Sequence, residues 1–265
     1  MNNYVFSATT SDAHIIKSLV EVLQNILREV CFVFDENGIS LETADEKKPW
    51  NLMVDLKLRN INFNEFHCKK KLNVGINLQH LYKLLKNIKK KDTIHLFIDK
   101  KDTSQLNITI TSPTGPSVTS FVQILKLSVM ESISFTNYVH PIHIDTSAFQ
   151  KMCKYMKSIA SSTKIYTKGS FIRFSADIPN MYGHNVPFGT LDDKSNDQEY
   201  ESSYNTNTLN QIIKISGLNN KMQVHIPLEK YAAITPLKIS VNAGQLGIMN
   251  IYIKTLDQLG ARQSQ

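Results

Sequence analysis

The sequence predicts an α+β protein in which strands outnumber helices. Most segments alternate apolar and polar residues with a period of two, which is typical of sheets that bury one face. Four other segments place apolar residues three and four positions apart, which is typical of amphipathic helices. Because 42% of the 265 residues are hydrophobic and 20% are charged, the chain can build a large core. At roughly 150 residues per domain, the length corresponds to one large or two small domains.

The expected strands share short runs of alternating residues. Asn37-Gly38 and Thr114-Gly115 lie between such runs and predict hairpin turns, since glycine tolerates the backbone that a tight turn requires. The clearest alternating runs are residues 54–58, 94–96, 106–110, 222–226, 237–241 and 249–253.

The four helical segments share an apolar stripe, and each is preceded by a Ser, Thr, Asn or Asp that can cap the first turn. The third segment, for example, has a stripe that includes Phe149, Tyr155 and Ile159. We expect helices at residues 12–30, 77–88, 146–159 and 207–216.

Three of these helices are similar to one another. Residues 78–88 align with residues 149–159 without a gap, which places Lys83 on Lys154 and Lys86 on Lys157, while Lys214 takes the Lys83 position in the fourth helix. The similarity indicates repeated units of one helix and several strands. Residues 128–137 have no clean period and are expected to connect two halves, and residues 192–204 are expected to form a solvated loop.

Signatures of catalysis and of cofactor binding are mostly absent. The sequence has no GxxxxGK[ST], GxGxxG, HExxH or GxSxG motif. His140 and His143 are expected to be outward polar positions of a strand rather than metal ligands, and the pairs Asp35-Glu36 and Asp192-Asp193 lie in apparent loops. We therefore expect no catalytic residue, no metal and no cofactor.

The cysteines and the chain ends predict a soluble intracellular protein. Cys31, Cys68 and Cys153 are widely spaced and odd in number, which favours buried reduced thiols over disulfides or a zinc site. The N-terminus lacks the pattern of a signal peptide, and no run is apolar enough for a membrane helix, so we expect no membrane partner.

Lysines in front of the apolar stripes indicate a surface for a polyanion. The formal net charge is +7, and lysines recur three residues apart on the second and third helices with few acidic neighbours. Lysine is a flexible point charge that suits loose contact with phosphates without reading of the bases. The residues concerned are Lys83, Lys86, Lys151, Lys154 and Lys157.

Several pieces, specific in their order and spacing, point to a known family. They are residues 16–31 followed by 37–41, residues 73–78 leading into 83–86, residues 149–159 and 171–176, and Pro236-Leu237 followed by Gly247 and Tyr252. From about residue 6 to residue 253 the chain resembles the sliding clamps of the proliferating cell nuclear antigen (PCNA) family.

The resemblance implies two similar clamp domains, at residues 1–127 and 139–254, with a connector at 128–138 and a tail at 255–265. It implies a head-to-tail homotrimer that closes into a ring, with sheets outside and four helices lining the channel. Such a ring encircles double-stranded DNA and tethers a DNA polymerase and other replication and repair enzymes, without catalysis.

The resemblance also implies the residues of three sites. The channel lysines comprise the five above together with Lys17 and Lys214. The subunit contact joins residues 117–125, where Phe121 matches an aromatic of the family, to residues 185–191, which include Val186 and Phe188. The pocket for a partner peptide comprises Ala44, Leu52, Ile133, Phe135, Tyr138, Pro236 and Tyr252.

The chain departs from the family in three respects. Its charge is +7, whereas family members are usually acidic. Pro187 lies in the expected edge strand and has no N–H to donate, and Ala44 is smaller than the usual pocket residue. The bias to Lys, Ile and Asn suggests the PCNA-like protein of a large cytoplasmic DNA virus; the location would be the host cytoplasm if viral and the nucleus if cellular.

Two other functions compete with this interpretation. A basic processivity factor of the same fold could hold DNA as a monomer or dimer by charge alone, which the high net charge favours slightly. A metal-dependent nuclease would need a cluster of carboxylates on one surface. The mass in solution separates the first alternative from a trimer, and divalent-dependent cleavage would reveal the second.

Overall fold

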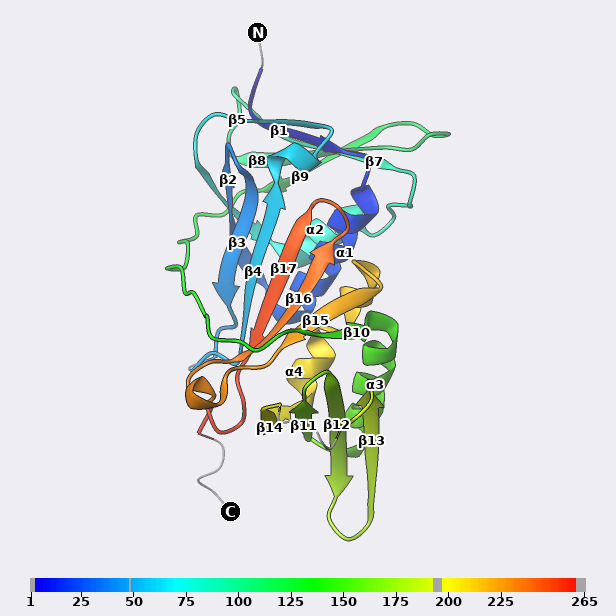
Figure 1. Cartoon of the computed structure of the whole chain (residues 1–265). Helices are drawn as coiled ribbons and strands as arrows, with labels where there is room; N and C mark the ends of the chain where they lie inside the picture. The colour runs from blue at the N-terminus through cyan, green and yellow to red at the C-terminus, as the bar shows by residue number, and fades with distance from the viewer. Residues whose placement is uncertain (1–2, 48, 193–196, 261–265) are drawn as a thin grey trace. The chain divides into compact units, whose positions relative to one another are not determined.

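The computed structural model describes residues 3–47, 49–192 and 197–260 (Figure 1). The chain divides into two compact units, each drawn from three stretches. Unit 1 takes its described residues from 1–43, 54–132 and 242–249, and unit 2 takes them from 44–53, 133–241 and 250–265.

The elements repeat the order strand, helix and three strands four times among the described residues. The first repeat is β1 (Tyr4–Thr10), α1 (Ala13–Ile26), β2 (Glu29–Asp35), β3 (Gly38–Ala44) and β4 (Leu52–Arg59). The second is β6 (Leu72–Asn77), α2 (Leu78–Leu85), β7 (Thr93–Asp99), β8 (Gln105–Thr111) and β9 (Val118–Gln123).

The later repeats have the same order. The third is β10 (Ile142–Asp145), α3 (Thr146–Ile159), β11 (Ser162–Lys168), β12 (Phe171–Ile178) and β13 (Tyr182–Phe188). The fourth is β14 (Glu199–Asn205), α4 (Thr206–Gln211), β15 (Lys221–His225), β16 (Leu237–Ala243) and β17 (Gly247–Ile253). Outside the repeats lie β5 (Glu65–Cys68) and the short 3-10 helices η1 (Asn60–Asn62), η2 (Ile213–Gly217) and η3 (Glu229–Tyr231). The prediction of repeated helix-plus-strand units is confirmed.

Paired repeats exchange their first strands. In unit 1, β1 is antiparallel to β7 and β6 is antiparallel to β2, so Phe6 faces Ile98 and Ile76 faces Val30. In unit 2, β10 pairs with β15 and β14 pairs with β11 in the same way. Each repeat therefore supplies one strand to a sheet of its neighbour within the unit.

The sheet orders leave defined edges. In unit 1 the strands lie in the orders β5-β1-β7-β8-β9 and β4-β3-β2-β6. In unit 2 the orders are β13-β12-β11-β14 and β10-β15-β16-β17. Within these orders β9 and β13 are terminal strands. Both predicted hairpin turns are present, and Gly38 in the first has φ of 140°, where an added Cβ would meet the carbonyl oxygen of Leu58.

Side-chain caps fix the start of three helices. The Oδ1 atoms of Asn77, Asp145 and Asn205 accept bonds from the N–H groups three residues later, at 3.1, 2.7 and 3.2 Å. The side chain of Asp12, the N-cap residue of α1, makes no such bond. It is the backbone carbonyl of Asp12 that accepts from Ile15 N at 2.9 Å.

The helices differ from the prediction mainly at their ends. The third helix begins and ends as predicted. Helix α1 ends at Ile26 because residues 29–35 form β2, which pairs with β3 on one side and β6 on the other. The second helix ends at Leu85, and the fourth is split into α4 and η2. Local periodicity therefore located each helix, whereas strand pairing decided where two of them stop.

The segment predicted as a solvated loop at residues 192–204 contains a strand. Residues 199–205 form β14, which pairs with β11, and the side chains of Tyr200 and Tyr204 are buried with their hydroxyl oxygens 2.5 Å apart. Residues 193–196 lie outside the described residues. The many Ser and Glu residues of this segment favoured a loop, although its two tyrosines pack in the core.

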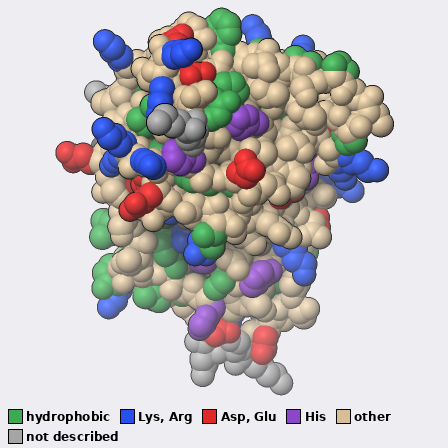
Figure 2. Space-filling model, turned by 90° about the horizontal axis from the view of Figure 1, so that it is seen from above, with side chains coloured by type: hydrophobic (Ala, Val, Ile, Leu, Met, Phe, Trp, Pro, Cys, Tyr) green, Lys and Arg blue, Asp and Glu red, His purple; other side chains and the backbone are tan. Residues whose placement is uncertain are grey.

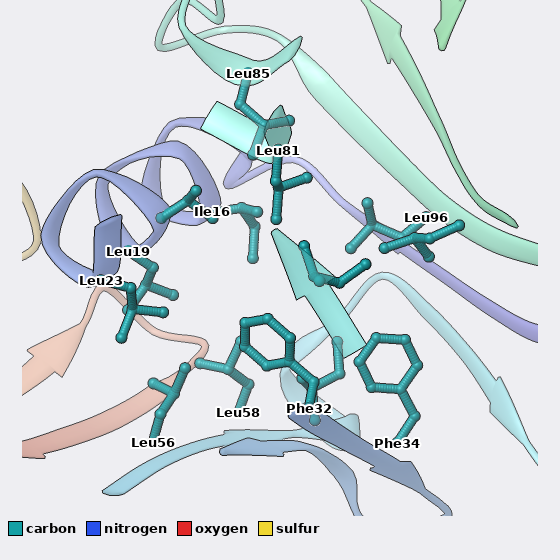
Figure 3. A pocket seen from close by; sticks show the side chains of 14 residues that line it. Ile16, Leu19, Leu23, Phe32, Phe34, Leu56, Leu58, Leu81, Leu85 and Leu96 are labelled. Atoms are coloured by element: carbon teal, nitrogen blue, oxygen red, sulfur yellow. The ribbon is translucent and has the colours of Figure 1, made fainter. Parts of the chain in front are cut away.

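The core of unit 1 is apolar and encloses a small cavity of about 50 Å³. Figure 3 shows Leu19 and Leu23 of α1 and Leu81 of α2 directed toward the same space as Phe32 and Leu58 of the strands. The three cysteines are buried and free, as predicted, and burial raises the pKa of the Cys153 thiol.

Candidate nucleic-acid interface and docking site

The exposed side of α2 is basic. Its buried side chains Leu78, Leu81 and Leu85 face the core of unit 1, where α2 packs against α1. Lys83 and Lys86 are exposed, the first within the helix and the second at its C-cap. A cation near a helix C-terminus is stabilised by the helix dipole, so the helix and its lysines support one another.

The exposed side of α3 repeats this arrangement in unit 2. Phe149, Met152 and Met156 are buried, and Lys151, Lys154 and Lys157 are exposed. Neither α2 nor α3 contains an Asp or a Glu. No salt bridge of the described residues involves these five lysines; the recorded pairs join Lys57, Lys164 and Lys168 to carboxylates. Their positive charge is available to phosphates.

Lys17 and Lys214 differ from these five lysines. Lys17 on α1 is half-buried, and its Nζ donates to the carbonyl oxygen of Ile88 at 3.2 Å. Lys214 is exposed but lies in the 3-10 helix η2 rather than in α4. Both lysines are predicted from the sequence to lie on helices that face a polyanion. In the structure Lys17 also makes a hydrogen bond within unit 1.

The strand expected at residues 117–125 is an edge strand. In β9, Phe121 is 54% exposed and its backbone pairs with β8 on one side. A cleft of about 520 Å³ beside it is lined by Lys83 and Leu84 of α2 and by Phe121. An exposed aromatic on a free edge is available to a partner.

The second expected edge is β13, which runs over residues 182–188 rather than 185–191. Val186 faces Phe174 in the sheet, and the ring of Phe188 lies 5.9 Å from that of Phe174, so both side chains are half-buried within unit 2. Pro187 pairs with Arg173 and cannot donate a hydrogen bond.

The exposure of Tyr155 contradicts its predicted place in the apolar stripe of α3. This residue was counted among the core residues, yet it is 61% exposed and its ring lies 5.7 Å from that of His184 on β13. Helical spacing alone placed it at the border of the stripe. With Met181 and Tyr182, it makes the β13 edge more apolar than Val186 and Phe188 alone would.

The predicted peptide pocket assembles within unit 2 but is largely filled by its own side chains. Leu52, Pro236 and Tyr252 are buried and Ala44 is half-buried. The ring of Phe135 lies 5.1 Å from that of Tyr252. These residues therefore form a floor rather than an open surface.

Phe135 and Tyr138 of the predicted pocket are half-buried. Phe135 also contacts Trp50, with ring centroids 6.0 Å apart. The hydroxyl of Tyr138 donates to the carbonyl oxygen of Pro236 at 3.1 Å, and burial raises the pKa of Tyr138. Both side chains pin the connector because an aromatic ring gains more from packing than from solvent. Ile133 stays exposed, at 39%.

Comparisons with known proteins agree with this architecture. Residues 5–134 match the family described as proliferating cell nuclear antigen, N-terminal domain. Over 265 residues the chain is 27% identical to the "Probable DNA polymerase sliding clamp 1" of Paramecium bursaria Chlorella virus 1, an alignment covering 95% of this chain and 97% of that protein. These similarities support a divergent, viral PCNA-like protein.

The PCNA resemblance inferred from short pieces of sequence is thus confirmed. The predicted α+β class is also confirmed, with strands outnumbering the four α-helices in the described part of the chain. No helix described here is long and apolar enough to cross a bilayer.

Sequence reasoning missed three residues close to those of the predicted peptide pocket, in the chain or by ring contact. Ile234 is 73% exposed, and the Nζ of Lys254 lies 4.1 Å from the centroid of the Trp50 ring. Burial lowers the pKa of Lys254, while the charge of Asp45 raises it. Trp50 is the single tryptophan of the sequence, a signal that could have drawn attention to it.

The candidate metal ligands do not converge. Among residues 3–47, 49–192 and 197–260, no three His, Cys, Asp or Glu side chains are grouped to hold a metal ion. His143 is exposed, with its Nε2 3.2 Å from the Nε2 of Gln223, and Asp35 caps the first hairpin turn through the N–H of Asn37. Asp193 lies outside the described residues. The geometry does not favour the nuclease alternative.

Proposed function

We propose that this sliding clamp and processivity factor encircles duplex DNA as a homotrimer and tethers a DNA polymerase and other replication and repair enzymes. The observation that supports it best is the pair of lysine faces on α2 and α3, each opposite a buried stripe and free of acidic residues on its own helix. Such faces attract phosphates without reading bases, which is what a sliding protein requires.

The two edges support assembly into a ring. The β9 edge displays Phe121, and the β13 edge displays Tyr182 and Met181, so the two surfaces differ. A contact between different surfaces is heterologous and closes into a ring when its rotation allows. Strand addition from β13 to β9 would satisfy backbone groups along both edges and bury the exposed aromatics.

A partner peptide would dock on unit 2. The floor of Leu52, Pro236 and Tyr252 is rigid because it is buried, and Ile133 and Ile234 remain exposed beside it. Exposed apolar side chains beside a buried floor provide contact area for an apolar partner segment. The clamp would act as a scaffold without chemistry of its own.

The division into domains at residues 1–127 and 139–254, with a connector at 128–138 and a tail at 255–265, belongs to the same proposal. It is supported by the lack of helix and strand between Leu125 and Tyr138. Residues 261–265 of the tail lie outside the described residues.

The topology of the DNA tests the ring. A polymerase is assayed for the length of its extension products on primed circular DNA and on primed linear DNA with free ends, each with and without this protein. A closed ring stays on circles and slides off linear ends, so stimulation should be confined to circular or end-blocked templates. Equal stimulation on both templates would contradict encirclement.

The monomeric or dimeric factor remains a second candidate because Pro187 weakens the β13 edge. Light scattering of the purified protein across a range of concentrations decides between them. A mass of three chains supports the trimer. A mass of one or two chains, together with stimulation on open linear DNA, supports charge-based binding.

A further inference from the structure

Two lysine-rich turns meet at the start of β1. Strand β1 lies between β5 and β7, where Phe6 faces Cys68 of β5 and Tyr4 faces Asp99 of β7. The turn after β5 holds three exposed lysines, and the turn after β7 holds two more. Register therefore places one turn on each side of Tyr4, although they lie far apart in the sequence. The lysines are Lys69, Lys70, Lys71, Lys100 and Lys101.

A cleft of about 470 Å³ lies between these turns, and we call it the Tyr4 cleft. Tyr4, Val5 and Leu72 contribute its apolar lining, and no carboxylate of the described residues lines it. The nearby Asp102 already accepts bonds from the N–H and the hydroxyl of Ser104, at 2.9 and 2.6 Å. The cationic lining consists of Lys69, Lys70 and Lys100, with His67 beside them.

Aromatic rings extend from the cleft along the outward face of the sheet. The Tyr4 ring lies 4.9 Å from that of Phe97 and 5.7 Å from that of His95. His95 and Phe97 are stacked with centroids 4.8 Å apart, and Ser7 Oγ lies 2.9 Å from His95 Nε2. All three rings are half-buried, so part of each remains accessible.

This face is the opposite of the one that meets the helices. Leu96 and Leu106 of the same sheet line the core cavity together with residues of α1 and α2, whereas alternation turns His95 and Phe97 to the other side. Figure 2, which looks down on the molecule of Figure 1, shows Lys, Arg and His side chains on the face that it presents, with Asp and Glu side chains among them. The rings therefore lie on the face of this sheet opposite the one that packs against α1 and α2 in unit 1.

We propose that the Tyr4 cleft and the rings beside it bind single-stranded nucleic acid. Proteins hold single strands by combining a positively charged groove with aromatic rings on which bases stack, without dependence on sequence. In the cleft, Lys69, Lys70 and Lys100 contact phosphates and Tyr4 stacks on a base. A duplex would satisfy the lysines but not the rings, since its bases are already stacked on one another.

The test measures the fluorescence anisotropy of a short labelled oligothymidylate with the full-length chain, as a function of salt. Lys69→Gln/Lys70→Gln/Lys100→Gln should lower the slope of log K against log salt by about 2, since each phosphate contact on a single strand contributes about 0.7. The matched control is Lys89→Gln/Lys90→Gln/Lys91→Gln, which removes the same charge from another exposed run of unit 1. Its slope should not change. An equal decrease of this slope in both variants would contradict binding at the Tyr4 cleft.

Tyr4 separates stacking from charge. Tyr4→Ser should weaken oligothymidylate binding by about 5- to 150-fold, the range for loss of one stacked base, whereas Tyr4→Phe should retain it. Duplex binding of the same length should be unaffected by either change. If Tyr4→Ser binds as well as the parent, the stacking role is wrong, and thermal melting shows whether each variant is folded.

A polyglutamate peptide tests an acidic protein segment as the occupant. The proposal expects the peptide to compete only weakly, because it lacks rings that can stack on Tyr4. If polyglutamate binds more tightly than oligothymidylate and loses affinity in the cleft variant, the surface is a docking site for acidic protein segments and the nucleic-acid proposal fails.

Discussion

The Nζ of Lys17 donates a hydrogen bond to the carbonyl oxygen of Ile88 at 3.2 Å, joining α1 to the turn that follows α2. Ile88 is itself buried, and its N–H donates to the carbonyl oxygen of Leu85 at 3.0 Å. The ammonium therefore satisfies a backbone carbonyl in the turn after α2, outside the helix itself. Lys17 has a structural partner that is recorded for none of the lysines on the exposed sides of α2 and α3.

Lys17→Met should lower the free energy of unfolding by about 1 kcal/mol, the typical net value of such a bond. Lys151→Gln serves as its control and should leave stability unchanged, because the Lys151 side chain is exposed in the middle of α3. Urea denaturation measures both. A Lys17 variant as stable as the parent would show that the bond to Ile88 contributes nothing.

Neutralising Lys83, Lys86, Lys154 and Lys157 together should flatten the salt dependence of duplex binding. Each phosphate contact contributes about 0.9 to the slope, so loss of four contacts in one subunit lowers it by up to about 3.6. The fold should survive because the buried stripes are untouched. If the slope stays constant while the Lys89–Lys91 control lowers it, the lysine faces of α2 and α3 do not contact DNA.

Phe121→Asp should convert the trimer to a monomer. Burying the exposed ring contributes roughly 1.5–3 kcal/mol per contact, and a carboxylate at that position would have to be desolvated. Ile61→Asp is a suitable control, since Ile61 is also exposed in unit 1 but lies in η1, away from β9. Sedimentation measures the mass; a Phe121→Asp trimer at sub-micromolar concentration would refute the interface.

Ile133→Ser/Ile234→Ser should abolish stimulation of a cognate polymerase while ring mass and DNA binding stay unchanged. These side chains are exposed, so the substitution removes docking area without opening the core. Pro236 is not suitable, because it is buried and its carbonyl oxygen accepts from Tyr138. Full stimulation of the polymerase by the double variant would show that the docking site lies elsewhere.

The half-buried His225 should make the protein less stable in mild acid. Burial, with the charges of Lys238 and His143, lowers the pKa of His225 from 6.5 to about 4, and its Nε2 is buried without a partner. Between these values the unfolded chain binds a proton that the folded chain does not, so stability falls as the pH falls from 6.5 to 4.

Melting temperatures measured across this pH window check the expectation for His225. His225→Gln should reduce the loss of stability on acidification, whereas His140→Gln should change it little, since His140 is exposed and its charge is not among those that act on His225. Parallel pH profiles for the parent and His225→Gln would assign the acid sensitivity to other groups.

Much of the fold follows from local pattern. The alternation of residues 106–110 and 249–253 predicts strands that the structure confirms, and the stripe of residues 146–159 gives both ends of α3. The lysine spacing on α2 and α3 requires only that a helix forms, since residues three apart then lie on one surface. Short pieces in a fixed order were enough to indicate the PCNA family.

The remaining features depend on residues that are distant in sequence. Whether residues 27–30 continue a helix or enter β2 is decided by pairing with β6, and whether Tyr204 lies in a loop or in the core is decided by pairing with β11. Phe135 is half-buried because its ring packs against those of Trp50 and Tyr252, which are distant in sequence. Likewise, the Tyr4 cleft exists only because β1 inserts between β5 and β7.

The sequence by itself determined the periods, the positive charge and the family, because each depends on neighbouring residues or on their order along the chain. Tertiary structure alone decided which apolar side chains stay exposed and which lysines share a surface. The physical reason is that strand exchange between repeats brings together side chains a whole repeat apart, and neither period nor composition encodes the register of that exchange.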